Sequence, residues 1–147
     1  MGVSIDGIVN EREVWAPLGE QVIGQPTRRL GILTGTAVFD FTGQGPQYVR
    51  DSLEFLVGPR FPDGTRVEQL GATGALASIA NDGTAVNAGW AVDEVDVDFD
   101  AANKRIKLTA RLAVRDVDGY IQRLSYEVNT IVLFPPVRIE PIALPTQ

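Results

Sequence analysis

The sequence predicts an all-β protein: an antiparallel β-sandwich, jelly-roll-like, with a closed β-barrel as the alternative. Three observations predict it. Residues 90–134 contain three long runs in which apolar and polar residues alternate, turn sequences separate these runs, and oppositely charged residues fall opposite one another when the first two runs are paired. The 147 residues correspond to one domain, so we expect 1–147 to form a single β domain.

The first part of the chain is predicted to be irregular. Residues 1–29 contain Pro17 and Pro26 between short apolar patches, and we expect an N-terminal arm that folds over a sheet or reaches a neighbouring subunit. Residues 30–41 then read as a strand, because a period of two places four apolar side chains on one face: Leu33, Ala37, Phe39 and Phe41.

The middle of the chain is less regular. Residues 48–57 fit either a helix or a strand, and we favour the strand because the surrounding elements are β. Residues 61–64 are predicted to form a turn, and the small residues of 67–80 a strand. The sequence Asn81-Asp82-Gly83 predicts a hairpin turn leading into residues 84–92.

A three-stranded meander is predicted for the C-terminal half. Pairing the first two runs across residues 101–104 places Val97 opposite Leu108 on the apolar face. The outward face then pairs Asp100 with Arg105, Asp98 with Lys107, Asp96 with Thr109 and Glu94 with Arg111.

The second hairpin of this meander is predicted to turn at Val117-Asp118-Gly119, with Gly119 in a left-handed G1 bulge. That turn places Leu112 opposite Leu124 and Leu108 opposite Val128. Residues 135–147 are Pro-rich, and we expect an extended tail or edge strand.

Composition excludes several functions. The chain has no His and no Cys, which removes the usual nucleophile pairs, Cys/His zinc sites and disulfides. The net charge of −6 disfavours nucleic-acid binding. We find neither a signal peptide nor a membrane-spanning segment, and expect a soluble chain without cofactors whose compartment the sequence leaves open.

Acidic clusters raise the question of a metal site. Asp116 and Asp118 resemble the start of a calcium loop, but the full pattern is not met. Glu94, Asp96, Asp98 and Asp100 form an acidic stripe with oxygen ligands of the kind that Ca²⁺ prefers. Because most of this stripe has basic partners in the predicted register, we expect solvated ion pairs and no metal site.

A weak catalytic candidate is the carboxylate pair Asp96 and Glu127, which the predicted meander places on either side of Thr109. This spacing suits an inverting glycosidase, although neither carboxyl is predicted to be buried. A carboxylate-dependent enzyme or a small-ligand barrel is therefore the third hypothesis for function.

The strongest predicted binding surface combines an aromatic ring with guanidinium groups at the end of the same face. The predicted register brings together Trp90, Val92, Arg115, Ile121 and Arg123. Such a surface suits a sugar ring or a protein partner. It is also consistent with a subunit interface, or with Trp90 being covered by the chain's own arm or tail.

The sequence favours a non-catalytic structural or assembly domain that forms a homo-oligomer through its arms and sheet edges. The alternative is a ligand-binding module, with carbohydrate as one candidate ligand, that uses the Trp90 and Arg115 surface. No sequence feature identifies a specific ligand.

Overall fold

The computed structural model describes residues 3–41, 43, 45–78, 89–115 and 121–137. This part of the chain forms seven strands and no helix. The strands are β1 (Ile5–Pro17), β2 (Thr27–Asp40), β3 (Val49–Val57), β4 (Arg66–Ser78), β5 (Gly89–Asp100), β6 (Arg105–Arg115) and β7 (Ile121–Phe134). The all-β prediction is confirmed.

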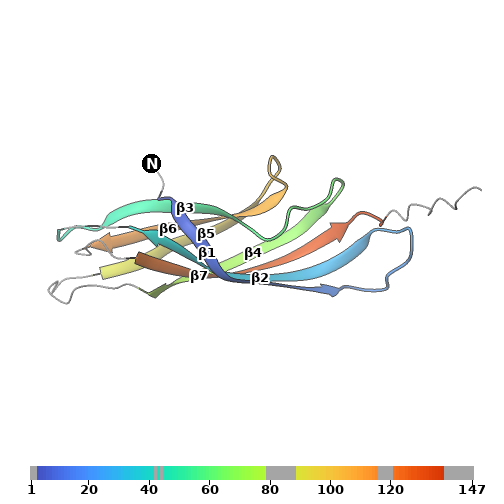
Figure 1. The fold of residues 1–147 in the computed structure, drawn as a ribbon, viewed down its shortest axis with the longest axis horizontal. Helices are drawn as coiled ribbons and strands as arrows, with labels where there is room; N and C mark the ends of the chain where they lie inside the picture. The colour runs from blue at the N-terminus through green and yellow to red at the C-terminus, as the bar shows by residue number, and fades with distance from the viewer. Residues whose placement is uncertain (1–2, 42, 44, 79–88, 116–120, 138–147) are drawn as a thin grey trace, which may run out of the picture.

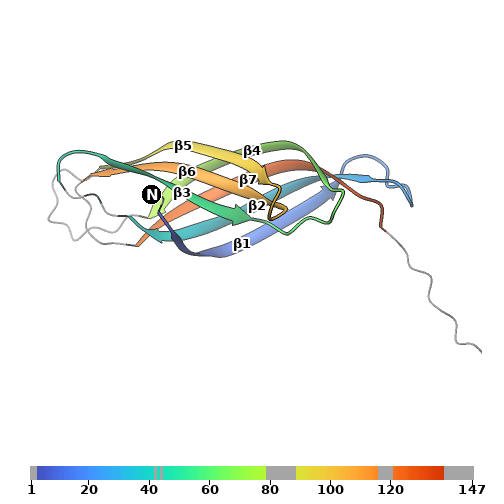
Figure 2. The same ribbon diagram turned by 90° about the horizontal axis from the view of Figure 1, so that it is seen from above.

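Two antiparallel sheets make up an elongated sandwich (Figures 1 and 2). One sheet has four strands in the order β1-β2-β7-β4, and the other has three in the order β3-β6-β5. The described strands thus form two separate sheets, and the single closed sheet of the alternative prediction does not occur. Only β1–β2 and β5–β6 are consecutive neighbours within a sheet, and the chain crosses between the sheets at each of the other four connections.

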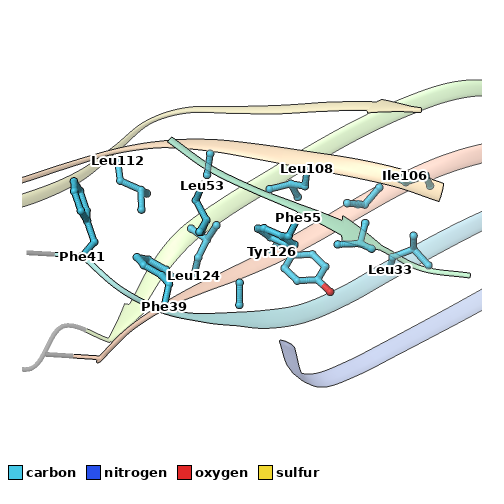
Figure 3. Close-up of a cluster of buried hydrophobic side chains, with 14 of the residues drawn as sticks. Leu33, Phe39, Phe41, Leu53, Phe55, Ile106, Leu108, Leu112, Leu124 and Tyr126 are labelled. Atoms are coloured by element: carbon cyan, nitrogen blue, oxygen red, sulfur yellow. The ribbon is translucent and has the colours of Figure 1, made fainter. Parts of the chain in front are cut away.

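The core lies between the two sheets (Figure 3). Leu33, Phe39 and Leu124 of the four-stranded sheet meet Leu53 and Leu108 of the three-stranded sheet, and all five are nearly inaccessible to solvent. Each of these strands alternates buried and exposed positions. This period of two is what places one apolar row of each strand in the core.

Strand β2 confirms the predicted strand of residues 30–41, and its predicted inward row is fully buried. Residues 48–57 are also resolved in favour of the strand, because β3 buries Leu53, Phe55 and Val57 at every second position. The predicted turn at 61–64 is present: Gly64 has a φ of +85°, and Thr65 N donates to Pro62 O at 3.2 Å.

The predicted irregular arm is wrong for residues 5–17, which form β1 along the edge of the four-stranded sheet. The alternation that marks a strand is broken here because the register against β2 shifts twice, between Ile5 and Gly7 and between Val9 and Arg12. These β-bulges displace side chains from one face to the other, so the sequence does not show a simple period of two.

The predicted register of the β5–β6 hairpin is confirmed from Glu94 opposite Arg111 to Asp100 opposite Arg105. Val97 and Leu108 lie opposite one another, as expected. The register then shifts by one residue between Val92 and Glu94, so Trp90 lies opposite Val114 and not opposite Arg115.

The third strand of the predicted meander is present as β7, but its predicted pairing with β6 is wrong. Strand β7 pairs with β2 and β4 in the other sheet, while β6 pairs with β3 and β5. Leu112 and Leu124 therefore face each other across the core rather than along a ladder. The alternation in β7 shows which of its sides faces the core. Every strand of the sandwich has such an apolar side, so the alternation does not identify which strand lies next to β7.

Three predictions fall on residues outside those described: the turn at Asn81-Asp82-Gly83, the left-handed Gly119, and most of the Pro-rich tail, of which only residues 135–137 are described.

Candidate protein interface

The predicted binding surface is divided between the two sheets. Val92 lies on β5 and packs against the core, and Trp90, two residues earlier, has 51% of its surface exposed. Arg115 is on β6, opposite Gly89. Ile121 and Arg123 are on β7, opposite Asp40 and Val38 of β2. The five residues therefore do not form one surface.

A β-bulge at Asp93 explains the position of Trp90. Because Asp93 is an extra residue in the ladder, the side chains that precede it change face. Trp90 shares a face with the buried Val114, whereas Arg115 shares the opposite, outer face with Gly89. The signal was present in the sequence: two consecutive acids, Asp93 and Glu94, interrupt the alternation between Val92 and Val95.

Sequence reasoning missed the true neighbour of Arg115. Its guanidinium lies 4.8 Å from the centre of the Tyr48 ring, and the guanidinium of Arg50 lies 5.6 Å from the same ring. Gly89 leaves room for this stack, because a Cβ there would come within 3 Å of both Tyr48 and Arg115. The contact joins β3 to β6, a pairing that alternation alone does not reveal.

The catalytic candidates Asp96 and Glu127 are not a pair. Asp96 lies opposite Thr109 on the outer face of the three-stranded sheet. Glu127 lies opposite Thr34 and Thr73 on the outer face of the four-stranded sheet. The whole thickness of the sandwich separates them, so the glycosidase arrangement does not form.

The acidic stripe belongs to a network of ion pairs and turn contacts. Glu94 pairs with Arg111 at 3.5 Å, and Lys107 Nζ lies 2.9 Å from Glu54 Oε1. Asp100 accepts hydrogen bonds from the backbone N–H groups of Ala102 and Asn103 and from the Asn103 side chain, which lower the pKa of its carboxyl.

Within the described ranges, no group of three or more acidic side chains is arranged to hold a metal ion. Asp116 and Asp118 lie outside these ranges.

We call the outer surface of the three-stranded sheet the ionic face. Besides the pairs just described, Arg50 Nε lies 3.2 Å from Asp93 Oδ2. Opposite charges thus face one another across all three strands. A surface of this kind is well solvated, and each exposed pair stabilises the fold by less than about 1 kcal/mol. The ionic face consists of Arg50, Glu54, Asp93, Glu94, Asp96, Asp98, Lys107 and Arg111.

The outer surface of the four-stranded sheet is different, because apolar side chains gather at one end of it. We call this group the apolar patch: Val14, Ala16, Leu18, Leu30, Ile32, Ile131 and Leu133. Their outward direction follows from the register. On β2, Gly31 and Leu33 are buried on either side of Ile32, so Leu30 and Ile32 point to the opposite, outer face. Leu30, Ile32, Ile131 and Leu133 do not belong to the core cluster or to the side chains packed against it.

The patch is continuous across three strands. Val14 lies opposite Ile32, and one row further along Ala16, Leu30 and Ile131 lie side by side on β1, β2 and β7. Val14 has 62% of its surface exposed. Strands that are apolar on both faces are typical of sheets covered on both sides. Part of β2 and the end of β7 therefore have the composition of strands buried on both sides. Their outer side, however, is not covered by any other part of the described chain.

An ion pair borders the patch. Arg28 of β2 and Glu68 of β4 reach toward each other across β7, with Arg28 Nε 2.6 Å from Glu68 Oε1. The hydrogen bond from Arg28 lowers the pKa of the Glu68 carboxyl and raises that of the guanidinium. The remainder of this outer face includes small polar residues, such as Thr34, Thr73 and Ser125, together with Arg123 and Glu127.

The connection between β1 and β2 extends the apolar surface to one end of the molecule, next to the end of β7 (Figure 1). Gln25 N donates to Val22 O at 3.1 Å, and Gly24 between them has a φ of +82°. This tight turn directs Ile23 into solvent, where 91% of its surface is exposed. Val22 is exposed as well.

Comparison with protein-family models, with curated proteins and with solved structures found no significant match. Among the described residues there is no helix of the length and apolar character needed to cross a membrane.

Proposed function

We propose that this chain is a structural assembly subunit that forms a homo-oligomer through the apolar patch on its four-stranded sheet. The observation that supports this proposal most strongly is the difference between the two outer faces. One is covered with ion pairs, while the other carries a continuous group of aliphatic side chains on three adjacent strands. Contiguous exposed apolar patches on soluble domains are typical of interaction sites.

The size of the face fits a stable dimer. Four strands of about 13 residues span a surface about 19 Å wide and about 43 Å long, on the order of 800 Å². Specific protein–protein interfaces bury about 800 Å² on each partner. Two sheets packed face to face bury apolar side chains in the same way as the sandwich itself.

A second copy is the occupant that the charges favour. The face carries both signs beside its apolar patch, with Arg28 and Arg66 near Glu68, and both Arg123 and Glu127 further along β7. In a twofold interface each surface meets itself, so a face of one sign would repel its copy, whereas a face with both signs does not.

The test compares two substitutions that add the same side chain to the two outer faces. Ile32→Lys places an ammonium in the apolar patch beside Val14, and Thr109→Lys places one between Glu54 and Asp96 on the ionic face. We expect sedimentation equilibrium to show an oligomer for the wild type and for Thr109→Lys. Ile32→Lys is expected to be a folded monomer, because the interface would bury an unpaired charge.

A wild-type chain that remains monomeric at high concentration would contradict the proposal. Loss of the oligomer in Thr109→Lys, with Ile32→Lys unaffected, would move the interface to the ionic face. Circular dichroism of each variant shows whether the fold is retained.

A further inference from the structure

A cleft opens on the flank of the sandwich where β1 and β3 border the two sheets. Near the start of β1 this flank is closed, because Val3 pairs with Leu53 of β3 and donates to Ser52 O at 2.8 Å. Further along β1 the two sheets separate, and a cleft of about 180 Å³ lies between them. Its lining includes Glu11, Glu13 and Arg105. This volume is smaller than that of sites for drug-sized ligands, which begin at about 300 Å³.

The β-bulge of β1 forms one wall of the cleft. Val9 lies opposite Thr36 and Arg12 opposite Thr34, so Asn10 and Glu11 together face Gly35. Asn10 adopts a left-handed conformation with a φ of +56°, which Asn tolerates better than most residues. Bulges of this kind redirect side chains and are frequent beside binding and active sites.

Tyr126 reaches the cleft from the core. Its ring packs against Phe55 at 5.4 Å between centres, and only 5% of the residue is exposed. Gly35, its neighbour on β2, has no side chain, and a Cβ there would overlap the Tyr126 hydroxyl end. In Figure 3 the hydroxyl lies at the far side of the ring from Phe55, toward Leu33, which also lines the cleft.

The Tyr126 hydroxyl makes no hydrogen bond to the residues that the structure describes, and it is not one of their buried unpaired polar atoms, so it is open to the cleft. Hydroxyl groups in folded proteins are nearly always paired, and one that opens into a cleft can donate to water or to a bound ligand. An aliphatic side chain at position 126 could also fill this part of the core without introducing a polar group. A polar group that is retained there, directed into a cleft, is consistent with a partner that comes from outside the chain.

Charged groups of both signs surround this hydroxyl. Arg105 Nε donates to Gly58 O at 3.0 Å, which fixes the guanidinium at the rim. Glu13 accepts a hydrogen bond of 3.3 Å from the indole N–H of Trp15. Glu11 and Arg12 complete a set of two carboxylates and two guanidinium groups. A small cation or a small anion would therefore meet repulsion as well as attraction.

We propose that this cleft binds a small zwitterion of the amino-acid class. The carboxylate of the ligand would accept hydrogen bonds from Arg105 and the Tyr126 hydroxyl, its ammonium would donate to Glu11, and a short aliphatic group would contact Leu33 and Pro59. The proposal is independent of the assembly interface, which lies on the outer face of the sheet.

The test uses three probes that share one aliphatic group. L-valine carries both charges, isobutyrate lacks the ammonium, and isobutylamine lacks the carboxylate. Each probe is titrated into the full-length chain while amide chemical shifts are followed by NMR. We expect L-valine to shift the amides of residues 11–13 and 105, and the other two probes to bind at least about tenfold more weakly, since each lacks a charge-assisted hydrogen bond.

Two variants connect the binding to the cleft. Tyr126→Phe removes one oxygen and keeps the ring on Phe55, and Glu11→Gln removes a charge from the exposed edge strand. Both are expected to weaken L-valine binding by about tenfold or more, whereas the control Tyr48→Phe, on the outer face of the other sheet, leaves it unchanged. The proposal is overturned if L-valine causes no shifts in the wild type, or if Tyr126→Phe and Glu11→Gln both bind it as the wild type does. Equal binding of isobutyrate or isobutylamine would overturn the zwitterion assignment.

Discussion

Tyr126 shows how one residue connects the core of this protein to its surface. Burial, together with the negative charge of Glu11, raises the pKa of its hydroxyl to about 12, while Arg105 acts in the opposite direction. At neutral pH the hydroxyl is therefore protonated and acts as a hydrogen-bond donor toward the cleft. The same shift makes the stability of the fold depend on pH in the alkaline range.

We predict that the wild type loses stability between about pH 10 and pH 12. An unfolded tyrosine has a pKa of about 10, so in this interval the unfolded state releases its proton while the folded state keeps it. The free energy of unfolding falls as the pH rises, by at most about 2–3 kcal/mol from this residue. Below about pH 10 both states are protonated, so this residue causes no loss of stability there.

Urea unfolding at pH 9 and at about pH 11.5 measures this effect by comparing variants. Tyr126→Phe is expected to lose less stability over the interval than the wild type, because it has no hydroxyl to ionise at this position. Equal losses in the wild type and Tyr126→Phe would show that the hydroxyl is not protected from ionisation in the folded state.

At the scale of the single strand, β2 has two apolar rows with different roles. Leu33 is buried in the core between the sheets, whereas Leu30 belongs to the apolar patch. We predict that Leu33→Ala lowers the free energy of unfolding by about 2–5 kcal/mol at every protein concentration, because it leaves a cavity in the core. Leu30→Ser is expected to have an effect that grows with protein concentration, because only the assembled form buries Leu30.

Chemical denaturation at several protein concentrations distinguishes the two effects. If the loss caused by Leu30→Ser does not depend on concentration, Leu30 contributes to the folded monomer alone, and the assigned interface is wrong.

Local patterns in the sequence predicted where the strands are better than they predicted which strands lie next to each other. The alternation in residues 95–110 determined the β5–β6 register, since a hairpin joins strands that are close in sequence. The bulges in β1 and at Asp93 defeated the same reasoning, because one extra residue reverses which face a side chain occupies. That reversal separated Trp90 from Arg115 and removed the predicted ligand surface.

The pairing of strands that are far apart in the sequence could not be predicted for a related reason. Strand β7 has a polar outward row, including Arg123 and Glu127, that suits a position beside β6 as well as one beside β2. Its neighbours are chosen by how all seven strands fill the core together. The apolar patch was overlooked for that reason: the outward direction of Leu30 and Ile131 becomes evident only once β2 and β7 are known to be adjacent.

For the molecule as a whole, the difference between the faces predicts how salt affects assembly. The chain has a net charge of −6, so two copies repel each other at low ionic strength. Salt shortens the range of this repulsion from about 30 Å at 0.01 M to about 8 Å at 0.15 M, whereas contacts between aliphatic side chains are not weakened. We therefore predict that the dissociation constant of the oligomer falls between these two salt concentrations. Ion pairs joining two ionic faces would be screened instead, so a dissociation constant that rises with salt in sedimentation equilibrium would assign assembly to the three-stranded sheet.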